Sequence, residues 1–170
     1  MDNLLKGKNG IIFGALDEKS IAWKVAEECV NSGAKIVLTN APTALRLGSV
    51  QKLAEKCNTE VISADATSLE DLENLLNKSM DIFGGKIDFI LHSIGMSVNV
   101  RKKKEYTNLN YDYLLKGLDV SAISFHKLLQ ISMKLDAINS WGSILALSYI
   151  AAQKTFPSYN DMAENKAYLE

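Results

Sequence analysis

Tyr159 and Lys166 lie seven residues apart, and they are the pair whose residue types and spacing most directly indicate a catalytic role. In a helix, that spacing returns the second side chain to nearly the same face two turns later. A phenol has a pKa near ~10 and donates a proton poorly at neutral pH, whereas a nearby cation favours the phenolate and makes the group a better acid. The pair therefore predicts acid chemistry in one cleft. The alternative is a buried tyrosine and a solvent-exposed lysine at chance spacing.

A turn that contains glycine follows the first apolar run of the chain. Residues 14–22 read GALDEKSIA, and a turn of this kind before a helix can present backbone N–H groups to a pyrophosphate. The turn departs from the G-x-G-x-x-G pattern, because Ser20 stands where a further glycine is expected after Gly14. A serine hydroxyl can still donate to a phosphate oxygen. The competing interpretation is an ordinary βα loop with a serine N-cap.

The residues after the second and third apolar runs bear on which dinucleotide would bind. Asn40 and Ala41 offer neither a carboxylate nor a cation, and Arg46 comes only later. Because arginine or lysine after the second strand accommodates the extra phosphate of NADP, their absence favours NADH. Asp65, with Ala66, follows the third run. A lone aspartate there is usually a turn or cap residue, but in a dinucleotide-binding fold it faces adenine.

The fourth apolar run ends in residues 92–97, HSIGMS. Gly95 permits a close approach of backbone to a ligand, at the point where nicotinamide would pass. Three strand ends thus converge on one crevice, as expected at the switch point of an open α/β sheet.

Five short apolar runs alternate with longer amphipathic segments, a pattern typical of a parallel sheet with helices on both faces. Continuous apolarity fits strands that are buried on both faces. We therefore expect an α/β fold with a doubly wound parallel sheet. The expected strands are residues 10–13, 34–39, 60–64, 87–92 and 143–149.

Helix signals occupy the segments between these runs. The first helix is expected from about Ser20 to a left-handed stop at Gly33, the second around Pro42, and the third after the capping pair Ser68 and Asp71. A long fourth helix is expected over residues 111–137 and a fifth near residue 157. The apolar positions expected to face the sheet are Ile21, Val25, Ala26 and Val30 in the first helix, Leu45, Val50 and Leu53 in the second, and Leu69, Leu72, Leu75, Leu76 and Ile82 in the third.

The composition indicates one soluble globular domain over residues 1–170, because 47% of the residues are apolar, 23% are charged and the net charge is -1. The near-zero charge argues against a nucleic-acid partner. The longest nearly apolar stretch, residues 143–152, is about half the ~20 residues that a membrane span needs. Cys29 and Cys57 are too few for a disulfide framework, so we expect a cytoplasmic location and packing roles for both.

Taken together, the motifs resemble the enoyl-acyl-carrier-protein reductases of the divergent short-chain dehydrogenase/reductase family, over the whole chain. Ordinary short-chain dehydrogenases have their tyrosine and lysine four residues apart, but the residue four beyond Tyr159 is Ala163. The wider spacing separates enoyl reductases from ketone reductases. The matching residues are Gly14, Ser20 to Trp23, Asp65, His92 to Gly95, Leu147 to Tyr149, Pro157, Tyr159, Asn160, Met162 and Lys166.

The resemblance implies a Rossmann-like sheet, NADH as cofactor and hydride transfer to the β-carbon of a trans-2-enoyl thioester. It puts Tyr159 against the thioester carbonyl, Lys166 on the nicotinamide ribose, Tyr149 at a second active-site tyrosine and Ser97 beside the acyl substrate. The chain departs from the family at Asn40 and Ala41, where a polar or basic residue is often found. The implied cofactor-binding residues are Gly14, Ser20, Ile21, Asn40, Ala41, Asp65, Ala66, Ser93, Ile94, Gly95 and Lys166.

The resemblance also implies acyl carrier protein as partner and a homotetramer as the assembled form. Arg101, Lys102, Lys103 and Lys104 form the only concentrated charge in the sequence, interpreted as a solvated loop or, alternatively, as a docking site for that acidic partner. The histidines His92 and His126 are expected to be structural, without a metal site.

Two other functions compete with enoyl reduction: reduction of another carbonyl or enoyl substrate by the same fold, and a non-catalytic dinucleotide-binding module. The family sheet continues beyond the point that corresponds to the last residue of this chain. We therefore expect a C-terminally truncated chain that is inactive alone.

Overall fold

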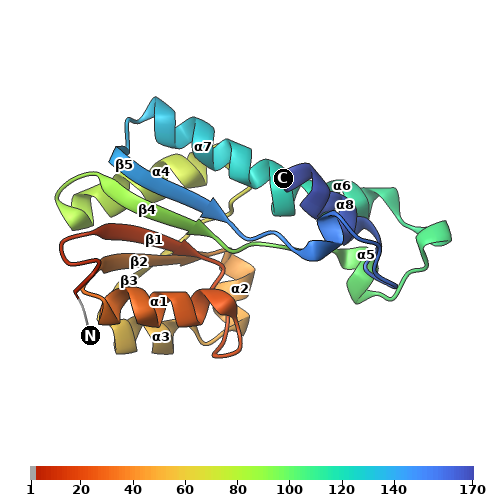
Figure 1. Ribbon diagram of the computed structural model, residues 1–170, viewed down its shortest axis with the longest axis horizontal. Helices are drawn as coiled ribbons and strands as arrows, with labels where there is room; N and C mark the ends of the chain where they lie inside the picture. Colours follow the sequence, from red (N-terminus) through yellow and green to blue (C-terminus); the bar gives the residue numbers. More distant parts are fainter. Residues whose placement is uncertain (1–2) are drawn as a thin grey trace.

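The short apolar runs form a five-stranded parallel sheet at the centre of the fold (Figure 1). The computed structural model describes residues 3–170. The strand order is β3-β2-β1-β4-β5, so the chain moves outward from β1 in both directions. The doubly wound parallel sheet predicted from the sequence is confirmed. The strands are β1 (Asn9–Phe13), β2 (Lys35–Asn40), β3 (Glu60–Ser63), β4 (Ile87–His92) and β5 (Ile138–Ala146).

One face of the sheet is covered by α1 (Ile21–Asn31) and α3 (Val50–Cys57), which lie side by side below it in Figure 1. Trp23 and Leu53 are buried there against Ile12 of β1, in one apolar cluster. Both cysteines belong to the same cluster and are free thiols.

The opposite face is covered by α4 (Leu69–Phe83) and α7 (Ser124–Lys134) (Figure 1). Leu75 and Leu128 pack with Ile11, whose side chain points to the opposite side of β1 from that of Ile12. Because successive central-strand residues are buried on alternate faces, the sheet core is mainly apolar, with Thr39 and His92 as buried polar residues at the strand ends. This is the physical origin of the continuous apolar runs.

The remaining helical segments gather beyond the carboxyl ends of the strands (Figure 1). They are α2 (Pro42–Leu47), α5 (Val98–Arg101), α6 (Tyr111–Leu118) and α8 (Asn160–Leu169), with 3₁₀ turns η1 (Tyr106–Asn108) and η3 (Ile150–Ala152). No described helix is both long and apolar enough to cross a bilayer.

The long fourth helix predicted from the sequence is interrupted by a π-helical turn, η2 (Asp119–Ile123), between α6 and α7. The last α-helical residue is Lys134, three residues before the predicted end. The apolar pattern is the same through the π turn, so periodicity does not reveal it. Such π turns often occur at functional sites.

The fifth strand begins five residues earlier and ends three residues earlier than predicted. Its pairing with β4 is irregular between Ile87 and Phe89, and Trp141 within it has a φ of 65°. A bulge of this kind leaves polar residues inside a strand, which an apolar pattern misses. Leu145 remains 60% exposed, so the expectation of burial on both faces is wrong for this strand.

Two predicted helices differ in their bounds. The second is split into α2 and α3 at Gly48, where an added Cβ would lie 2.7 Å from the carbonyl oxygen of Leu16. The fifth begins at Asn160 instead of near residue 157, because Ser158 and Asn160 both have positive φ values. By contrast, the capping pair is confirmed, since the Ser68 hydroxyl accepts the Asp71 N–H.

Three apolar residues expected to face the sheet are exposed instead. Ile21 is 64% exposed at the first position of α1, and Leu69 and Ile82 lie near the two ends of α4. Terminal positions of a helix extend beyond the sheet edge, so their place on the apolar stripe does not bury them.

Gly14 follows β1 with a φ of 87°, and an added Cβ would lie 1.9 Å from the carbonyl oxygen of Ser93. We predict that Gly14→Ala lowers the free energy of unfolding by about 2–4 kcal/mol, because both the backbone angle and the contact oppose a side chain. Urea denaturation measures the change. Gly85→Ala is the control, since nothing lies within 4 Å of its added Cβ. Equal stability of the two variants would refute this account of Gly14.

Candidate active site

A cavity of about 660 Å³ lies at the carboxyl ends of the strands, the edge at which open α/β sheets bind ligands. Its walls come from the segments that follow β1, β2, β3 and β4, together with α5, α6 and the π turn. Six of the residues predicted to bind cofactor line it: Asn40, Ala41, Asp65, Ala66, Ile94 and Gly95.

Gly14 and Ser93 do not line the cavity but fix the position of two of its walls. The Gly14 N–H donates to the Thr39 carbonyl at 3.1 Å, and the Gly14 Cα lies against the Ser93 backbone. The turn after β1 is therefore held between the ends of β2 and β4. This contact places Leu16 and Asp17 in the cavity wall.

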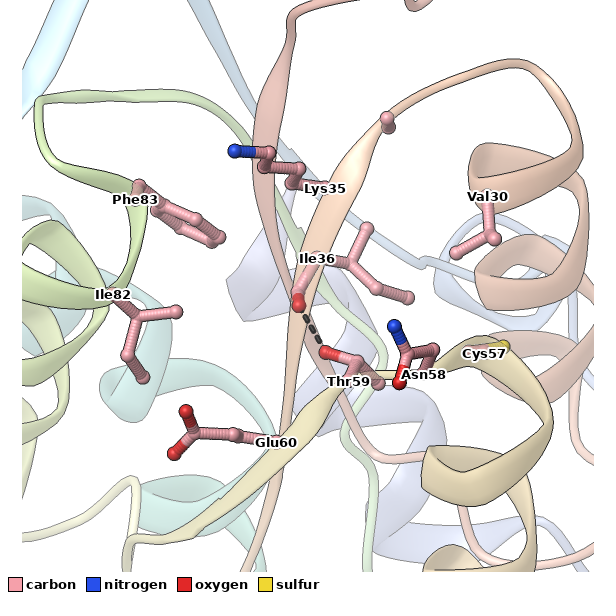
Figure 2. A pocket seen from close by; sticks show the side chains of 10 residues that line it. Val30, Lys35, Ile36, Cys57, Asn58, Thr59, Glu60, Ile82 and Phe83 are labelled. Carbon is pink, nitrogen blue, oxygen red and sulfur yellow. Dashed lines mark hydrogen bonds between the residues drawn. The ribbon is translucent and has the colours of Figure 1, made fainter.

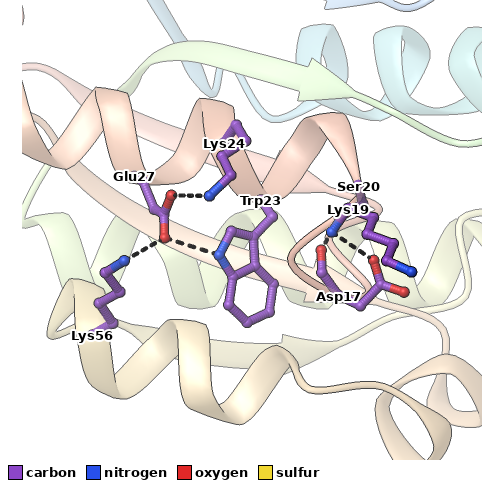
Figure 3. A network of polar contacts seen from close by, with 7 residues as sticks. All are labelled: Asp17, Lys19, Ser20, Trp23, Lys24, Glu27 and Lys56. Carbon is purple, nitrogen blue, oxygen red and sulfur yellow. Dashed lines mark hydrogen bonds and ion pairs between the residues drawn. The ribbon is translucent and has the colours of Figure 1, made fainter.

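Ser20 occupies the N-cap position of α1 but does not cap it with its side chain. Its hydroxyl donates to the Asp17 carbonyl at 2.7 Å and accepts the Leu16 N–H at 3.2 Å. The serine therefore closes the turn on itself (Figure 3). In the described chain, no side-chain hydrogen bond caps the first turn of α1. The Trp23 N–H donates to the Ser20 carbonyl at 3.2 Å, which leaves the N–H groups of Ile21 and Ala22 open to an anion. Ile21 lies at this same helix end.

The body of α1 is tied to α3 by Glu27, which accepts hydrogen bonds from Lys56 at 2.6 Å, Trp23 at 2.9 Å and Lys24 at 3.0 Å (Figure 3). The hydrogen bond from Lys56 is the main reason that the pKa of Glu27 falls to about 2. The network fixes the orientation of α1, which follows the turn that contributes Leu16 and Asp17 to the cavity wall; Ser20 and Ile21 do not line the cavity.

The two predicted residues after β2 and β3 have local roles in shaping the wall. The Asn40 amide donates to the Ala15 carbonyl at 3.0 Å, which joins the ends of β1 and β2. Asp65 accepts hydrogen bonds from the backbone and hydroxyl of Thr67 and is exposed. Its outer oxygen, Oδ2, is not used in these bonds.

The π turn supplies a contact that sequence reasoning missed. The Ser121 hydroxyl accepts the Met96 N–H at 2.9 Å and donates to the Met96 carbonyl at 3.1 Å. The segment after β4 is thereby fixed against the helix. Two cations, Arg101 and Lys116, also line the cavity from α5 and α6. Arg101 belongs to the basic run identified in the sequence, whereas Lys116 lies far from the strand ends and no local motif marks it.

Tyr149 and Tyr159 lie side by side, with ring centroids 5.0 Å apart and planes inclined by 49°. Phe156 packs on the other side of Tyr149 at 5.5 Å. Tyr149 precedes η3 instead of ending a strand, and Tyr159 is the N-cap of α8. The structure thus brings the two predicted tyrosines together, although neither lines the cavity.

Lys166 is buried on α8, and its ammonium donates to the Leu147 carbonyl at 2.5 Å and to the Ile94 carbonyl at 3.3 Å. Ile94 lines the cavity, so the lysine lies behind this part of the wall, although Lys166 is not itself a lining residue. Desolvation lowers the pKa of Lys166. An ammonium has three N–H donors, so one remains for a ligand.

The expected electrostatic effect of Lys166 on Tyr159 is wrong in its direction. Burial raises the pKa of Tyr159, and the neighbouring Tyr149 acts in the same sense. The lysine ammonium is directed at backbone carbonyls instead of the phenol. Tyr159 is therefore a neutral hydrogen-bond donor at neutral pH instead of an acid activated by a cation.

Ser97 does not face the cavity. It is buried, and its hydroxyl donates to Asp161 at 2.7 Å while accepting the Val100 N–H at 3.0 Å. No local sequence pattern indicates this pairing, because Ser97 and Asp161 are far apart in the chain.

The residues at the cavity fit a dinucleotide. The uncapped first turn of α1, which follows the Leu16 and Asp17 wall, suits a pyrophosphate, and the remaining donor of Lys166 suits a hydroxyl. Within residues 3–170, no group of three or more metal-ligating side chains could hold a metal ion.

A second cavity, of about 610 Å³, lies at the opposite edge of the sheet, where β2 and β3 begin (Figure 2). Figure 2 shows its polar contact, in which the Thr59 hydroxyl donates to the Ile36 carbonyl. It contains none of the predicted site residues. The amino ends of parallel strands are not the edge at which this class of sheet binds ligands.

Comparison with known proteins agrees with this geometry. A family model described as "Enoyl-(Acyl carrier protein) reductase" matches residues 14–170. The NADH-type enoyl-[acyl-carrier-protein] reductase 1 of Rhizobium meliloti is 33% identical over 169 residues, covering 98% of this chain and 60% of that protein. The FabI protein of Rickettsia bellii is 34% identical and is covered over 63% of its length. The chain thus spans about 60% of the length of these curated relatives.

Solved structures give the same result. The FabI–NADH complex from Alistipes finegoldii matches with a TM-score of 0.96 and 67% identity, over 98% of this chain and 59% of that chain. The Bacillus cereus enoyl-acyl carrier protein reductase, solved with NADP+, matches with a TM-score of 0.88 and 28% identity, over 99% of this chain and 65% of that one.

His92 ends β4 in full burial, with Nε2 2.8 Å from the Ser124 hydroxyl. Desolvation, with a smaller effect of Lys166, lowers the pKa of His92 from 6.5 to about 4. Below about pH 6.5 the unfolded chain binds a proton that the folded chain does not, so stability is lost as the pH falls toward 4.

We predict that the free energy of unfolding falls by about 3 kcal/mol more between pH 7 and pH 4 in the wild type than in His92→Gln. Urea denaturation at a series of pH values measures this difference. His126→Gln, at an exposed position, is the control and keeps the wild-type profile. Parallel profiles for the wild type and His92→Gln would show that the buried histidine is not the cause.

Proposed function

Because the chain belongs to the enoyl-(acyl carrier protein) reductase family, we propose that it acts in the reduction of the trans-2 double bond of an enoyl group carried by acyl carrier protein. In this proposal residues 1–170 are one dinucleotide-binding domain, incomplete at its C-terminus. The observation that carries it is the buried Lys166 ammonium, which binds the Ile94 carbonyl of the cavity wall from the helix that begins at the tyrosine pair. In this pathway step, a saturated acyl chain is the product.

NADH supplies the hydride when it is bound. The absence of a cation among the residues directly after β2 supports NADH, as does the NADH complex of the 67% identical FabI. The residues proposed to hold NADH are Gly14, Ser20, Ile21, Asn40, Ala41, Asp65, Ala66, Ser93, Ile94, Gly95 and Lys166.

In the proposed mechanism, Tyr159 stabilises the negative charge that develops on the thioester oxygen. A neutral phenol suits this role because it can donate a hydrogen bond to the enolate as an oxyanion-hole donor does. Its raised pKa keeps the proton on the phenol oxygen in the resting state. Tyr149, in contact with it, orients the ring. Ser97, whose hydroxyl donates to Asp161, is the residue proposed to lie beside the acyl substrate.

Lys166 has a binding role in this mechanism. Two of its N–H groups are held by backbone carbonyls, so the ammonium has a fixed position from which the third can bind a ribose hydroxyl. We further propose a homotetrameric assembly and a cytoplasmic location, both of which follow from the family resemblance.

We predict that Tyr159→Phe lowers the turnover of a crotonyl thioester by about 100-fold or more, because it removes one oxyanion donor. The decay of NADH absorbance at 340 nm measures turnover, and NADH fluorescence measures binding, which should stay within about twofold. The matched control is Tyr168→Phe, an exposed tyrosine on the same helix. Full turnover in Tyr159→Phe would remove this role. These assays use the full-length protein, because residues 1–170 alone are expected to be inactive. Measurable NADH binding without turnover in the full-length wild type would favour a non-catalytic module.

The basic segment formed by Arg101, Lys102, Lys103 and Lys104 is the proposed docking site for acyl carrier protein. Its first three side chains are exposed at the end of α5, and Arg101 also borders the cavity. Exposed cations attract an acidic partner, and salt screens the attraction.

We predict that changing all four residues to glutamine raises KM for the carrier-protein substrate by about tenfold at low salt. KM for a small uncharged enoyl thioester should not change, because it lacks the acidic surface. Steady-state kinetics at two salt concentrations measure both values. An unchanged KM for the carrier-protein substrate would rule out docking at this segment.

A further inference from the structure

Asp161 is a completely buried carboxylate in the first turn of α8, 0% exposed, two residues after Tyr159. Within residues 3–170, no lysine, arginine or histidine forms an ion pair with it. A buried carboxylate is costly unless hydrogen bonds satisfy it. Its two oxygens accept the Ser97 hydroxyl at 2.7 Å and the Asn99 amide at 3.1 Å.

The proton directions in this cluster are fixed by its outer contacts. The Ser97 oxygen accepts the Val100 N–H, so its own proton is available to Asp161. The Asn99 oxygen accepts the Asn110 N–H at 3.0 Å, so its amide nitrogen faces Asp161. Both partners are therefore donors, and only an acceptor suits position 161.

The backbone beside Asp161 is strained. Ser158 has a φ of 63° and Asn160 a φ of 42°, so non-glycine residues with left-handed backbone flank Tyr159 on both sides. Such residues cost of order 1–3 kcal/mol each and persist only where the surrounding contacts hold them. The Asn160 amide donates to the Lys104 carbonyl at 2.5 Å, which is one such contact.

The second contact is the Asp161 cluster. The segment after β4 thus holds the start of α8 at two adjacent residues, through Ser97 and Asn99 on one side and Lys104 on the other. Farther along the helix, the Lys166 ammonium binds the Ile94 carbonyl of the same segment. One stretch of chain therefore sets the position of both predicted catalytic side chains.

We propose that Asp161 is a positioning residue: by binding the start of α5, it holds the turn that presents the Tyr159 hydroxyl. The inference rests on the proposed function and adds to it a residue that never contacts substrate or cofactor. In Asp161→Asn, the new amide NH₂ would face either the Ser97 hydroxyl or the Asn99 amide, both of which are donors. One of the two hydrogen bonds that hold the turn would therefore be lost. A small displacement of a catalytic group can lower the rate by about 100-fold.

The test uses the full-length enzyme with crotonyl thioester and NADH. Asp161→Asn should lower kcat by about tenfold to 100-fold, while the NADH dissociation constant stays within about twofold, because the Lys166 contacts are separate. Glu164→Gln is the matched control: it removes a charge from the same helix at an exposed position, where the carboxylate only accepts the Tyr106 hydroxyl.

A second variant separates positioning from general stability. Combining Ser97→Asp with Asp161→Ser exchanges acceptor and donor across the same contact, and aspartate is a good N-cap for α5. The exchange should restore kcat to within about threefold of wild type.

Three outcomes would overturn the inference: an unchanged kcat in Asp161→Asn, an equal loss in Glu164→Gln, or recovery of the melting temperature without recovery of kcat in the exchanged variant. Absence of both NADH binding and turnover in the wild type would instead refute the proposed function itself.

Discussion

The buried ammonium of Lys166 is the interaction on which the geometry of the candidate site depends. A buried cation must be hydrogen-bonded, because leaving it without partners in a low-dielectric interior is costly. Here the partners are the carbonyls of Leu147 and Ile94, which follow β5 and β4. The need to satisfy one charge therefore joins two strand ends to α8. The tyrosines lie on the segments that this contact connects.

The same dependence on backbone groups extends across the site. Gly14 touches Ser93 through main-chain atoms, Met96 is held by Ser121 through its N–H and carbonyl, and the Asn40 amide binds the Ala15 carbonyl. Backbone positions are set by the parallel sheet, so these contacts transmit the rigidity of the core to the cavity wall.

The sheet and its two helical layers follow from the sequence because the central strands are buried on both faces and the helices have clear ends. Ser68 and Gly33 mark helix termini through local hydrogen bonding and backbone freedom, so their roles are visible in a short window. The bulge at the start of β5 and the π turn depend on pairing with distant segments. The periodicity of a single segment contains no information about them.

In the candidate site, too, the residues with local sequence signals could be predicted and those that depend on distant contacts could not. Gly14, Asp65 and Ile94 could be identified because each follows a strand directly. Asp161 could not, since its role depends on contacts with Ser97 and Asn99, more than 60 residues away. The direction in which the pKa of Tyr159 shifts could not be predicted from the sequence either, because burial sets it and the spacing of the lysine does not.

Ser158 and Asn160, the two left-handed residues that flank Tyr159, affect how many conformations this loop can adopt. Glycine would adopt their backbone angles without strain, but it would also give the loop many more accessible conformations. Serine and asparagine restrict that range. The chain therefore accepts local backbone strain in exchange for a narrower ensemble, in which fewer alternative loop conformations compete with the one that faces the cleft.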